Sequence, residues 1–350
     1  MKISQVVTSA ALCAIAAFAR ADEPVRGEPY DSGWAFYIDN DVFAPRNADR
    51  DYTGGFSLTL AGRRAREAWW STDALRASTD RILGLDSLYA DRTLTRHSVE
   101  IGVTLFTPGN IAAPAPGDRP YASLVYLANT GVQVVPEREL AYISTLTIGI
   151  LGAPIVGNGQ KAFHRAIGSA EPVGWKHQIS NGGEPTVRYS VARVTRAWAG
   201  NVAGARGEAT STMYASAGYL TEVTYGIATR FGQFSTPWWS YNPQIAEYAE
   251  KSVPVVASEG SGPERYFWGG MNVRLRAYNA FLQGQFRDSD VTFSPSDLNH
   301  LLVEGWLGYT FASASGWRVS YVLRALSPEV RDGPANRTQT WGGIVISYAQ

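Results

Sequence analysis

The residues with the most evident chemical potential lie in one short stretch, residues 159–171, with the sequence GQKAFHRAIGSAE. Gln160 and His164 are four positions apart, so in a helix they share one face. Gly168 stands where a glycine commonly ends a helix. A histidine imidazole titrates near neutral pH and can take a proton from water. We therefore predict a short helix that presents His164 as a general base, with a histidine in a surface loop as the alternative.

Two adjacent side chains, Asn40 and Asp41, form a second candidate site at the end of an alternating segment. A carboxylate and an amide side by side offer oxygens that suit a hard cation such as calcium, and the amide can also donate to an oxyanion. The run DYTGG, residues 51–55, follows closely. Ordinary turn chemistry is the alternative, because Asn, Asp and Gly are all frequent in turns.

Arginines near these motifs could recognise phosphate groups. Arg119 lies in the run GDRPYA, where it could either pair with Asp118 or bind a phosphate. Arg50 also lies close to the Asn-Asp pair. His177, in the run GWKHQ, is a rival candidate for the base.

Several common catalytic signatures are absent from the sequence. It contains no G-x-S-x-G nucleophile elbow, no H-E-x-x-H motif and no phosphate-binding P-loop. Cys13 is the only cysteine, so removal of the N-terminal segment would leave neither a disulfide framework nor a thiol nucleophile. The net charge is zero, which gives no electrostatic reason to expect nucleic acid as a partner.

The N-terminal segment has the composition of a secretory signal. Lys2 supplies positive charge, residues 6–19 are mainly apolar, and residues 19–21 (Ala-Arg-Ala) fit an A-x-A cleavage site. The apolar run is too short for the alternative, an N-terminal membrane anchor. We predict a signal peptide over residues 1–21 and one exported domain over residues 22–350.

The exported domain alternates apolar and polar residues, the pattern of strands with two different faces. Glycine (35), tyrosine (18) and tryptophan (11) are abundant, which suits tight turns and aromatic membrane belts. We predict an all-β protein, a closed antiparallel transmembrane β-barrel of about twelve strands with short helical insertions. The predicted strands are residues 34–42, 54–60, 98–106, 121–134, 140–151, 186–198, 210–219, 220–231, 267–279, 298–311, 317–326 and 340–348.

An even number of strands puts both chain ends on the periplasmic side of the membrane. The predicted outer loops are then residues 43–53, 107–120, 152–185, 280–297 and 327–339, with a tight turn near Tyr219. The polar motifs described above all fall in or beside the first three of these loops. Two long insertions, residues 61–97 and 237–263, fall on the periplasmic side, and we predict that both cap the periplasmic mouth of the barrel.

Together the motifs resemble the lipid A 3'-O-deacylase family of the Gram-negative outer membrane. The resemblance rests on the Asn-Asp pair with DYTG downstream, on TP followed by GDRPYA, and on QxxxHRxIG followed by GWxxQ. It extends from Trp34 to about Tyr189. It implies a barrel enzyme that uses Ca²⁺ to hydrolyse the ester of the 3'-acyloxyacyl group of lipid A in lipopolysaccharide.

The resemblance also implies roles for individual residues. Those implied to be catalytic are His164, Asn40, Asp41 and Thr53. Those implied to bind calcium are Asp41 and Glu171. Arg119 and Arg50 would contact the phosphates of lipid A, and we expect a monomer in the outer membrane. Two other functions remain open: an outer-membrane phospholipase with a serine nucleophile, and a porin-like barrel without enzymatic activity.

Overall fold

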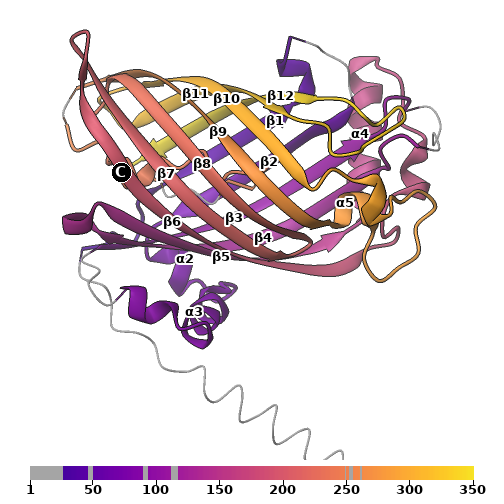
Figure 1. Ribbon diagram of the computed structural model, residues 1–350, viewed down its shortest axis with the longest axis horizontal. Helices are drawn as coiled ribbons and strands as arrows, with labels where there is room; N and C mark the ends of the chain where they lie inside the picture. Colours follow the sequence, from indigo (N-terminus) through magenta and orange to yellow (C-terminus); the bar gives the residue numbers. More distant parts are fainter. Residues whose placement is uncertain are drawn as a thin grey trace, which may run out of the picture.

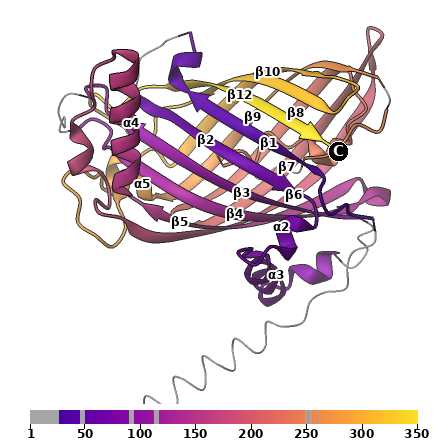
Figure 2. The same ribbon diagram turned by 180° about the vertical axis from the view of Figure 1, so that it is seen from behind.

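The computed structural model describes residues 27–45, 50–89, 94–111, 117–248, 250–251, 255–260 and 262–350. Within them, twelve antiparallel strands close into one barrel, in which each strand pairs with its neighbours in sequence and β1 pairs with β12 (Figures 1 and 2). The predicted fold class is therefore confirmed. The predicted signal peptide, residues 1–21, lies outside the described residues.

The strands lie close to the predicted segments. β5 (Leu140–Leu151) and β11 (Trp317–Leu326) have the predicted bounds. The others are β1 (Gly33–Asn40), β2 (Asp51–Ala61), β3 (Leu94–Thr107), β4 (Ala122–Val135), β6 (Glu184–Val202), β7 (Ala205–Gly218), β8 (Leu220–Gln233), β9 (Glu264–Asn279), β10 (Leu301–Ala312) and β12 (Gln339–Ala349). Their length suits strands that cross a membrane at a tilt.

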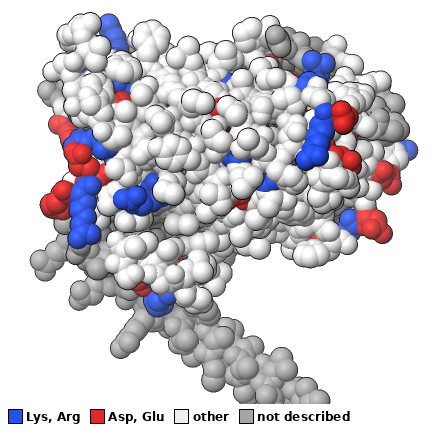
Figure 3. All heavy atoms as spheres, in the orientation of Figure 1, with Lys and Arg blue, Asp and Glu red and all other residues white. Residues whose placement is uncertain are grey.

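Side chains alternate between the lumen and the outer face along the strands. On β10, Leu301, Val303 and Leu307 are exposed, whereas Leu302 and Glu304 are buried. On the face shown in Figure 3, Lys, Arg, Asp and Glu lie mainly toward the two ends of the barrel. An apolar outer face between charged ends is what a barrel needs in order to lie in lipid. Among the described residues, no helix has both the length and the apolar character to cross a bilayer.

Helix α4 (Pro154–Ile167) lies at the end of the barrel opposite the C-terminus (Figures 1 and 2). It begins five residues before the predicted stretch, with a proline in its first turn, where the missing N–H costs no hydrogen bond. It ends as predicted at Gly168, whose φ of 71° is the left-handed cap conformation. Strand parity places the other outer loops at the same end. The remaining helices are α2 (Arg64–Glu67), α3 (Asp73–Ile82) and α5 (Ala280–Gln283), with short 3-10 turns at 41–43, 85–89, 136–138, 174–177, 238–240 and 295–297.

The predicted position of residues 61–97 is wrong. Their helices α2 and α3 lie beside the barrel wall instead of across its mouth (Figures 1 and 2). The side-chain oxygen of Asn129 on β4 accepts from the backbone N–H and the hydroxyl of Thr72, both at 2.9 Å. Arg76 of α3 donates to Ser144 on β5 at 2.7 Å. Polar side chains on the outside of the wall need hydrogen-bond partners that lipid cannot supply, so they hold the helices there.

The predicted position of residues 237–263, here called the lumen segment, is wrong for the middle of the segment. Residues 243–248 and 250–251 enter the barrel, whereas Trp238 lies under Arg196 at the periplasmic end of β6 and residues 257, 259 and 260 are exposed. Glu247 and Glu250 pair with Arg188 of β6 at 3.0 and 2.8 Å, and the ring of Tyr248 lies 4.8 Å from that of Phe106 on β3. A barrel of this size is too wide for its wall side chains to fill, so a piece of chain occupies the lumen.

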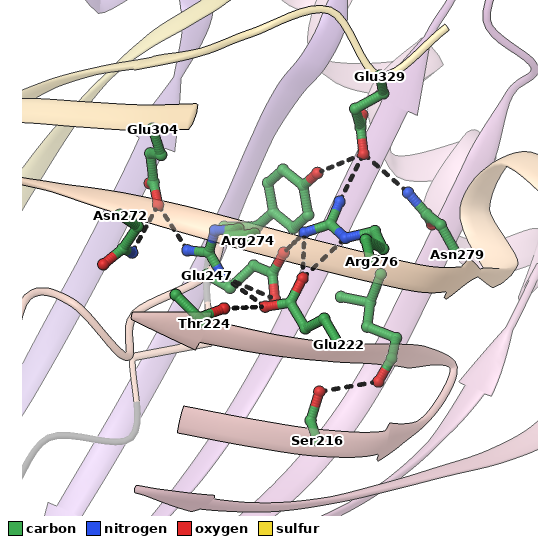
Figure 4. A network of polar contacts seen from close by, with 12 residues as sticks. Ser216, Glu222, Thr224, Glu247, Asn272, Arg274, Arg276, Asn279, Glu304 and Glu329 are labelled. Atoms are coloured by element: carbon green, nitrogen blue, oxygen red, sulfur yellow. Dashed lines mark hydrogen bonds and ion pairs between the residues drawn. The ribbon is translucent and has the colours of Figure 1, made fainter. Parts of the chain in front are cut away.

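A network of buried ion pairs ties the wall to the lumen segment (Figure 4). Arg276 on β9 lies between Glu222 of β8, Glu247 of the lumen segment and Glu329 of the loop after β11. Arg274, two residues earlier, joins Glu222 to Glu304 of β10. Each carboxylate in the network has a cationic partner, which is the condition for burying charge without a large penalty.

Candidate active site

An apolar cavity of about 810 Å³ lies outside the barrel wall at its outer end, between α4 and strands β1 to β4. Its size is in the range of ligand-binding pockets. Its apolar lining is Ile38, Val42, Phe43, Phe56, Val103, Leu105, Val125, Ile155, Val156 and Phe163. Its polar lining is Asn40, Thr53, Gln160, His164 and Ser169. Three residues that the sequence assigned to catalysis, His164, Asn40 and Thr53, are thus brought together from separate segments.

His164 sits in the last turn of α4 and is 95% buried, with 5% of its surface exposed. Its Nδ1 lies 2.7 Å from the carbonyl oxygen of Ala170. Because a carbonyl only accepts, Nδ1 carries the proton in the neutral ring and Nε2 is the basic nitrogen. The chain can reach back to the ring because it reverses at Gly168, where the N–H of Ser169 also bonds the carbonyl of His164 at 2.9 Å. The backbone after α4 therefore sets which ring nitrogen can act as a base.

Gln160, one turn before His164, also lines the cavity. Its Oε1 accepts a hydrogen bond of 2.7 Å from the indole N–H of Trp175. Its Nε2 has no hydrogen-bond partner among the described residues, although the side chain is 92% buried. A buried donor without a partner is costly unless a ligand satisfies it. The indole thus leaves the amide of Gln160 as a donor beside the cavity.

Asn40 and Thr53 approach the cavity from β1 and β2. The Oδ1 of Asn40 accepts from the N–H of Val42 at 2.8 Å, which leaves its amide nitrogen as the group able to donate. Thr53 lies at an irregularity in the pairing of β2 with β3, between Tyr52 and Gly54. Such a bulge redirects a side chain. The hydroxyl of Thr53 hydrogen-bonds that of Thr107 on β3.

The two predicted calcium ligands differ in burial: Asp41 is buried and Glu171 is exposed. Asp41 is buried next to Asn40, and its Oδ2 accepts from the N–H of Arg50 at 2.6 Å. Glu171 is at the surface, where both of its oxygens accept from Arg165 at 3.0 Å. That hydrogen bond lowers the pKa of the Glu171 carboxyl below its usual value. Among the described residues no group of three or more His, Cys, Asp or Glu is arranged to hold a metal. The oxygens of Asp41 and Asn40 fit calcium chemically, whereas Glu171 in this position does not.

A family model described as "Outer membrane protein LpxR" matches residues 6–350. The chain belongs to the LpxR family. Among solved structures it is similar to LpxR from Salmonella typhimurium, with a TM-score of 0.69 at 18% identity over 91% of this chain and 99% of that one. A Bordetella autotransporter β domain (TM-score 0.41, 9% identity) and the KdgM porin (0.37, 6%) each align with 91% of this chain and 99% of their own. No curated protein sequence matches.

Family and fold together place this LpxR-family protein in the outer membrane. The predicted resemblance is confirmed over nearly the whole chain, beyond the segment from Trp34 to Tyr189 that carried the motifs. The cavity then faces the lipid at the outer leaflet, because strand parity puts α4 at the outer end.

Arg119 of this LpxR-family protein does not line the cavity. Its guanidinium is buried over the ring of Phe106, 4.3 Å from the centroid, and pairs with Glu329 at 2.6 Å. The alternative ion pair with Asp118 is not formed either, because Asp118 pairs with Arg337 at 2.7 Å. Arg119 is thus held in the interior and is not placed to bind a substrate phosphate. The side chain of Arg50 is exposed at the outer rim, so its phosphate contact stays a prediction.

Glu329 is the interior partner of Arg119. Burial favours the neutral acid, but the nearby guanidinium groups of Arg119 and Arg276 outweigh it and hold the pKa of Glu329 at about 2. The charged carboxylate is therefore part of the folded structure at neutral pH.

The other described histidines lie away from the cavity. His177, the rival base, hydrogen-bonds Asp290 in the outer loop between β9 and β10. His300 contacts the carbonyl of Arg276 at 2.8 Å, and His97 contacts Glu28 at 2.8 Å on the periplasmic half. None of the three is among the residues that line the cavity.

Two features of the site escaped the sequence analysis. One is the apolar lining, because Phe56, Val103 and Val125 read simply as lipid-facing strand residues. The other is the hydrogen bond from Trp175 to Gln160. The helical spacing of Gln160 and His164 was the available signal for Gln160, but nothing in the sequence showed that Trp175 folds back onto α4.

Proposed function

We propose that this protein is a carboxylic ester hydrolase that removes the ester-linked 3'-acyloxyacyl group of lipid A, with His164 as the base that activates water. The observation that carries the proposal is the placement of His164 on the wall of an apolar cavity outside the barrel at its outer end. The esters of lipid A lie in the outer leaflet where sugar meets acyl chain. A cavity open to that leaflet lets an acyl chain enter sideways from the membrane. His164, Asn40 and Thr53 meet within a single chain, and we propose that the monomer is sufficient.

The hydrogen bonds of the site support the following chemistry. Nε2 of His164 takes a proton from water as its oxygen attacks the ester carbonyl carbon. The amide nitrogens of Gln160 and Asn40 would donate to the oxygen that becomes negative in the tetrahedral intermediate. The imidazolium then returns its proton to the sugar oxygen as the carbon–oxygen bond breaks. Thr53, anchored to Thr107, would orient the water.

Calcium belongs to the same proposal. Bound through Asp41, the ion would supply positive charge beside the developing oxyanion. Asn40 would add its amide oxygen as a ligand if the hydrogen bond from the N–H of Val42 breaks. Glu171 would become a ligand only after its ion pair with Arg165 opens.

The replacement His164→Ala tests the base. We expect ester release to fall by at least 10²-fold, the usual contribution of general acid–base catalysis, with the barrel still folded. The assay is mass spectrometry of lipid A after incubation with the purified protein, in which the lost mass identifies the acyl group. His177→Ala is the control and should keep full activity, because this residue lies outside the cavity. Full activity of His164→Ala would refute the mechanism.

A serine nucleophile, as in the phospholipase alternative, makes a different prediction. Ser169 is the only described serine in the lining of the cavity. With water as the nucleophile, Ser169→Ala keeps its activity and the wild type survives a serine-directed phosphonate. Loss of activity in both experiments, with fatty acid released from glycerophospholipids, would favour the phospholipase.

Calcium binding can be measured without activity, by titration calorimetry or terbium luminescence. We expect Asp41→Asn to abolish binding. Because Arg165 competes with the ion for Glu171, Arg165→Ala should tighten binding and Glu171→Gln should weaken it. Unchanged binding in Asp41→Asn would remove calcium from this site.

A further inference from the structure

The outer face of the barrel is polar in one sector of its periplasmic half. Tyr126 of β4 points into the lumen, where it hydrogen-bonds Glu100, so Asn129, three residues later, points outward. On β5, Thr147 points into the lumen and hydrogen-bonds Glu250, so Ser144, three residues earlier, points outward. Outward polar groups at such positions would be unsatisfied in lipid. Other sectors of the wall expose apolar side chains instead, among them Val223, Ile227, Leu275 and Leu307.

Helix α3 covers this polar sector with its charged side. Asp73, Arg76 and Asp80 are charged, yet all three are buried against the wall. Arg76 pairs with both acids at 2.7 and 2.8 Å, and Asp80 accepts from the hydroxyls of Ser144 and Tyr189. The polar face of α3 is therefore turned toward the protein.

The opposite side of the same insertion is apolar and exposed. Trp69 and Ile82 expose 95% and 84% of their surface, and Leu75, Leu83 and Leu88 are also exposed. A helix on a water-soluble surface has the reverse arrangement, with its apolar side inward and its charges in water. A cluster of large apolar side chains at the surface marks an interaction site.

We propose that α2 and α3 lie in the periplasmic leaflet of the outer membrane and that their exposed apolar side chains contact phospholipid acyl chains. The insertion satisfies the polar sector of the wall and presents hydrocarbon in its place, which makes the lipid-facing belt continuous around the barrel. Figures 1 and 2 show α2 and α3 beside the wall, toward the end that carries the chain terminus. The charged side chains Arg63 and Arg66 pair with Glu67, and Arg81 pairs with Asp86, so each of these arginines has an acidic partner.

Nitroxide accessibility in liposomes tests this placement. The full chain with Cys13→Ser carries no other cysteine, so single labels can be introduced at Ile82→Cys and Leu75→Cys. The protein is reconstituted in phosphatidylethanolamine–phosphatidylglycerol vesicles, and collisions with oxygen and with a water-soluble nickel complex are compared. Oxygen concentrates in lipid, whereas the nickel complex stays in water. The measured quantity is the ratio of the collision rate with oxygen to that with the nickel complex. We expect this ratio to be at least tenfold higher for both labels than for a label in water.

Two matched labels define the scale. Leu307→Cys on the outer face of β10 reports lipid, and Ala203→Cys in the periplasmic turn between β6 and β7 reports water. Labels at 75 and 82 that match the Leu307 position support the proposal. Labels that match Ala203, or that are shielded from both reagents as in a contact with another protein or a second copy, overturn it. Heat-modifiable migration on gels confirms that each labelled barrel is folded.

Discussion

Neighbouring residues take different roles here because successive strand side chains face opposite sides of the wall. Asp39 and Asn40 are adjacent on β1, yet Asp39 pairs with Lys251 in the lumen and Asn40 lines the cavity outside. Two arginines of the outer loops, which lie outside the strands, also face different environments. Arg119 is turned inward to Glu329, whereas Arg50 is exposed at the rim. The identity of a polar residue near the outer end therefore does not reveal whether it meets substrate.

The buried ion pairs of Glu329 make the stability of the protein depend on pH. Its pKa in the folded protein, about 2, is below the ordinary value of 4.5. The charged form therefore stabilises the fold fully above about pH 4.5, and this contribution is lost as the pH falls toward 2. We expect Glu329→Gln to lower the free energy of unfolding at pH 7 by about 3 kcal/mol, because it leaves Arg119 and Arg276 without their shared partner.

The measurement is denaturant unfolding of the purified barrel at pH 7 and pH 3. The wild type should lose more stability between the two values than Glu329→Gln. Glu137→Gln, at an exposed turn between β4 and β5, is the matched control and should behave as the wild type. Equal pH dependence in wild type and Glu329→Gln would contradict the assignment.

Helix α4 is the element that converts a lipid-facing wall into a site. It lies against Trp175 so closely that a Cβ on Gly157 would be 2.5 Å from the indole Cγ. The indole in turn holds Gln160 by a hydrogen bond and packs on Tyr121, with 4.9 Å between ring centroids. Close packing at Gly157 thus sets where Gln160 and His164 stand relative to β1 and β2.

A side chain at position 157 should therefore displace the site without unfolding the barrel. We expect Gly157→Val to lower the rate of lipid A deacylation by on the order of 10²-fold, because small displacements of reacting groups have effects of that size. The rate is followed by mass spectrometry of lipid A. Ala162→Val places the same residue on the exposed side of the same helix and should keep most of the activity. Equal activity of the two variants would show that α4 tolerates displacement.

Considered as a whole, the molecule is a filled barrel. The lumen segment, the ion pairs of Arg188, Arg274 and Arg276, and the aromatic cluster around Tyr248 occupy the interior. The cavity that carries the proposed chemistry lies outside the wall. This arrangement suits the proposed action on molecules in the membrane, and the interior serves as the hydrophobic and ionic core of the protein.

The filled lumen predicts a closed barrel. In planar bilayers we expect no stepwise conductance of the porin type from the wild type. Arg188→Ala leaves Glu247 and Glu250 without a cationic partner on β6, and we expect brief openings in this variant. Stable porin-like steps in the wild type would revive the porin alternative and contradict the observed interior.

The pattern of amino acids was enough to predict the strands, their number and the end of the barrel at which the polar motifs meet, because alternation and strand parity are local properties that add up along the chain. It also pointed to His164, through helical spacing and family motifs. The folded chain was needed to show where the two long insertions lie, which arginine faces inward and which residues line the cavity. Those features depend on which distant side chains satisfy one another: Arg188 with Glu247, Asn129 with Thr72, Trp175 with Gln160. Such pairs are chosen by three-dimensional proximity and burial, which no spacing along the chain records.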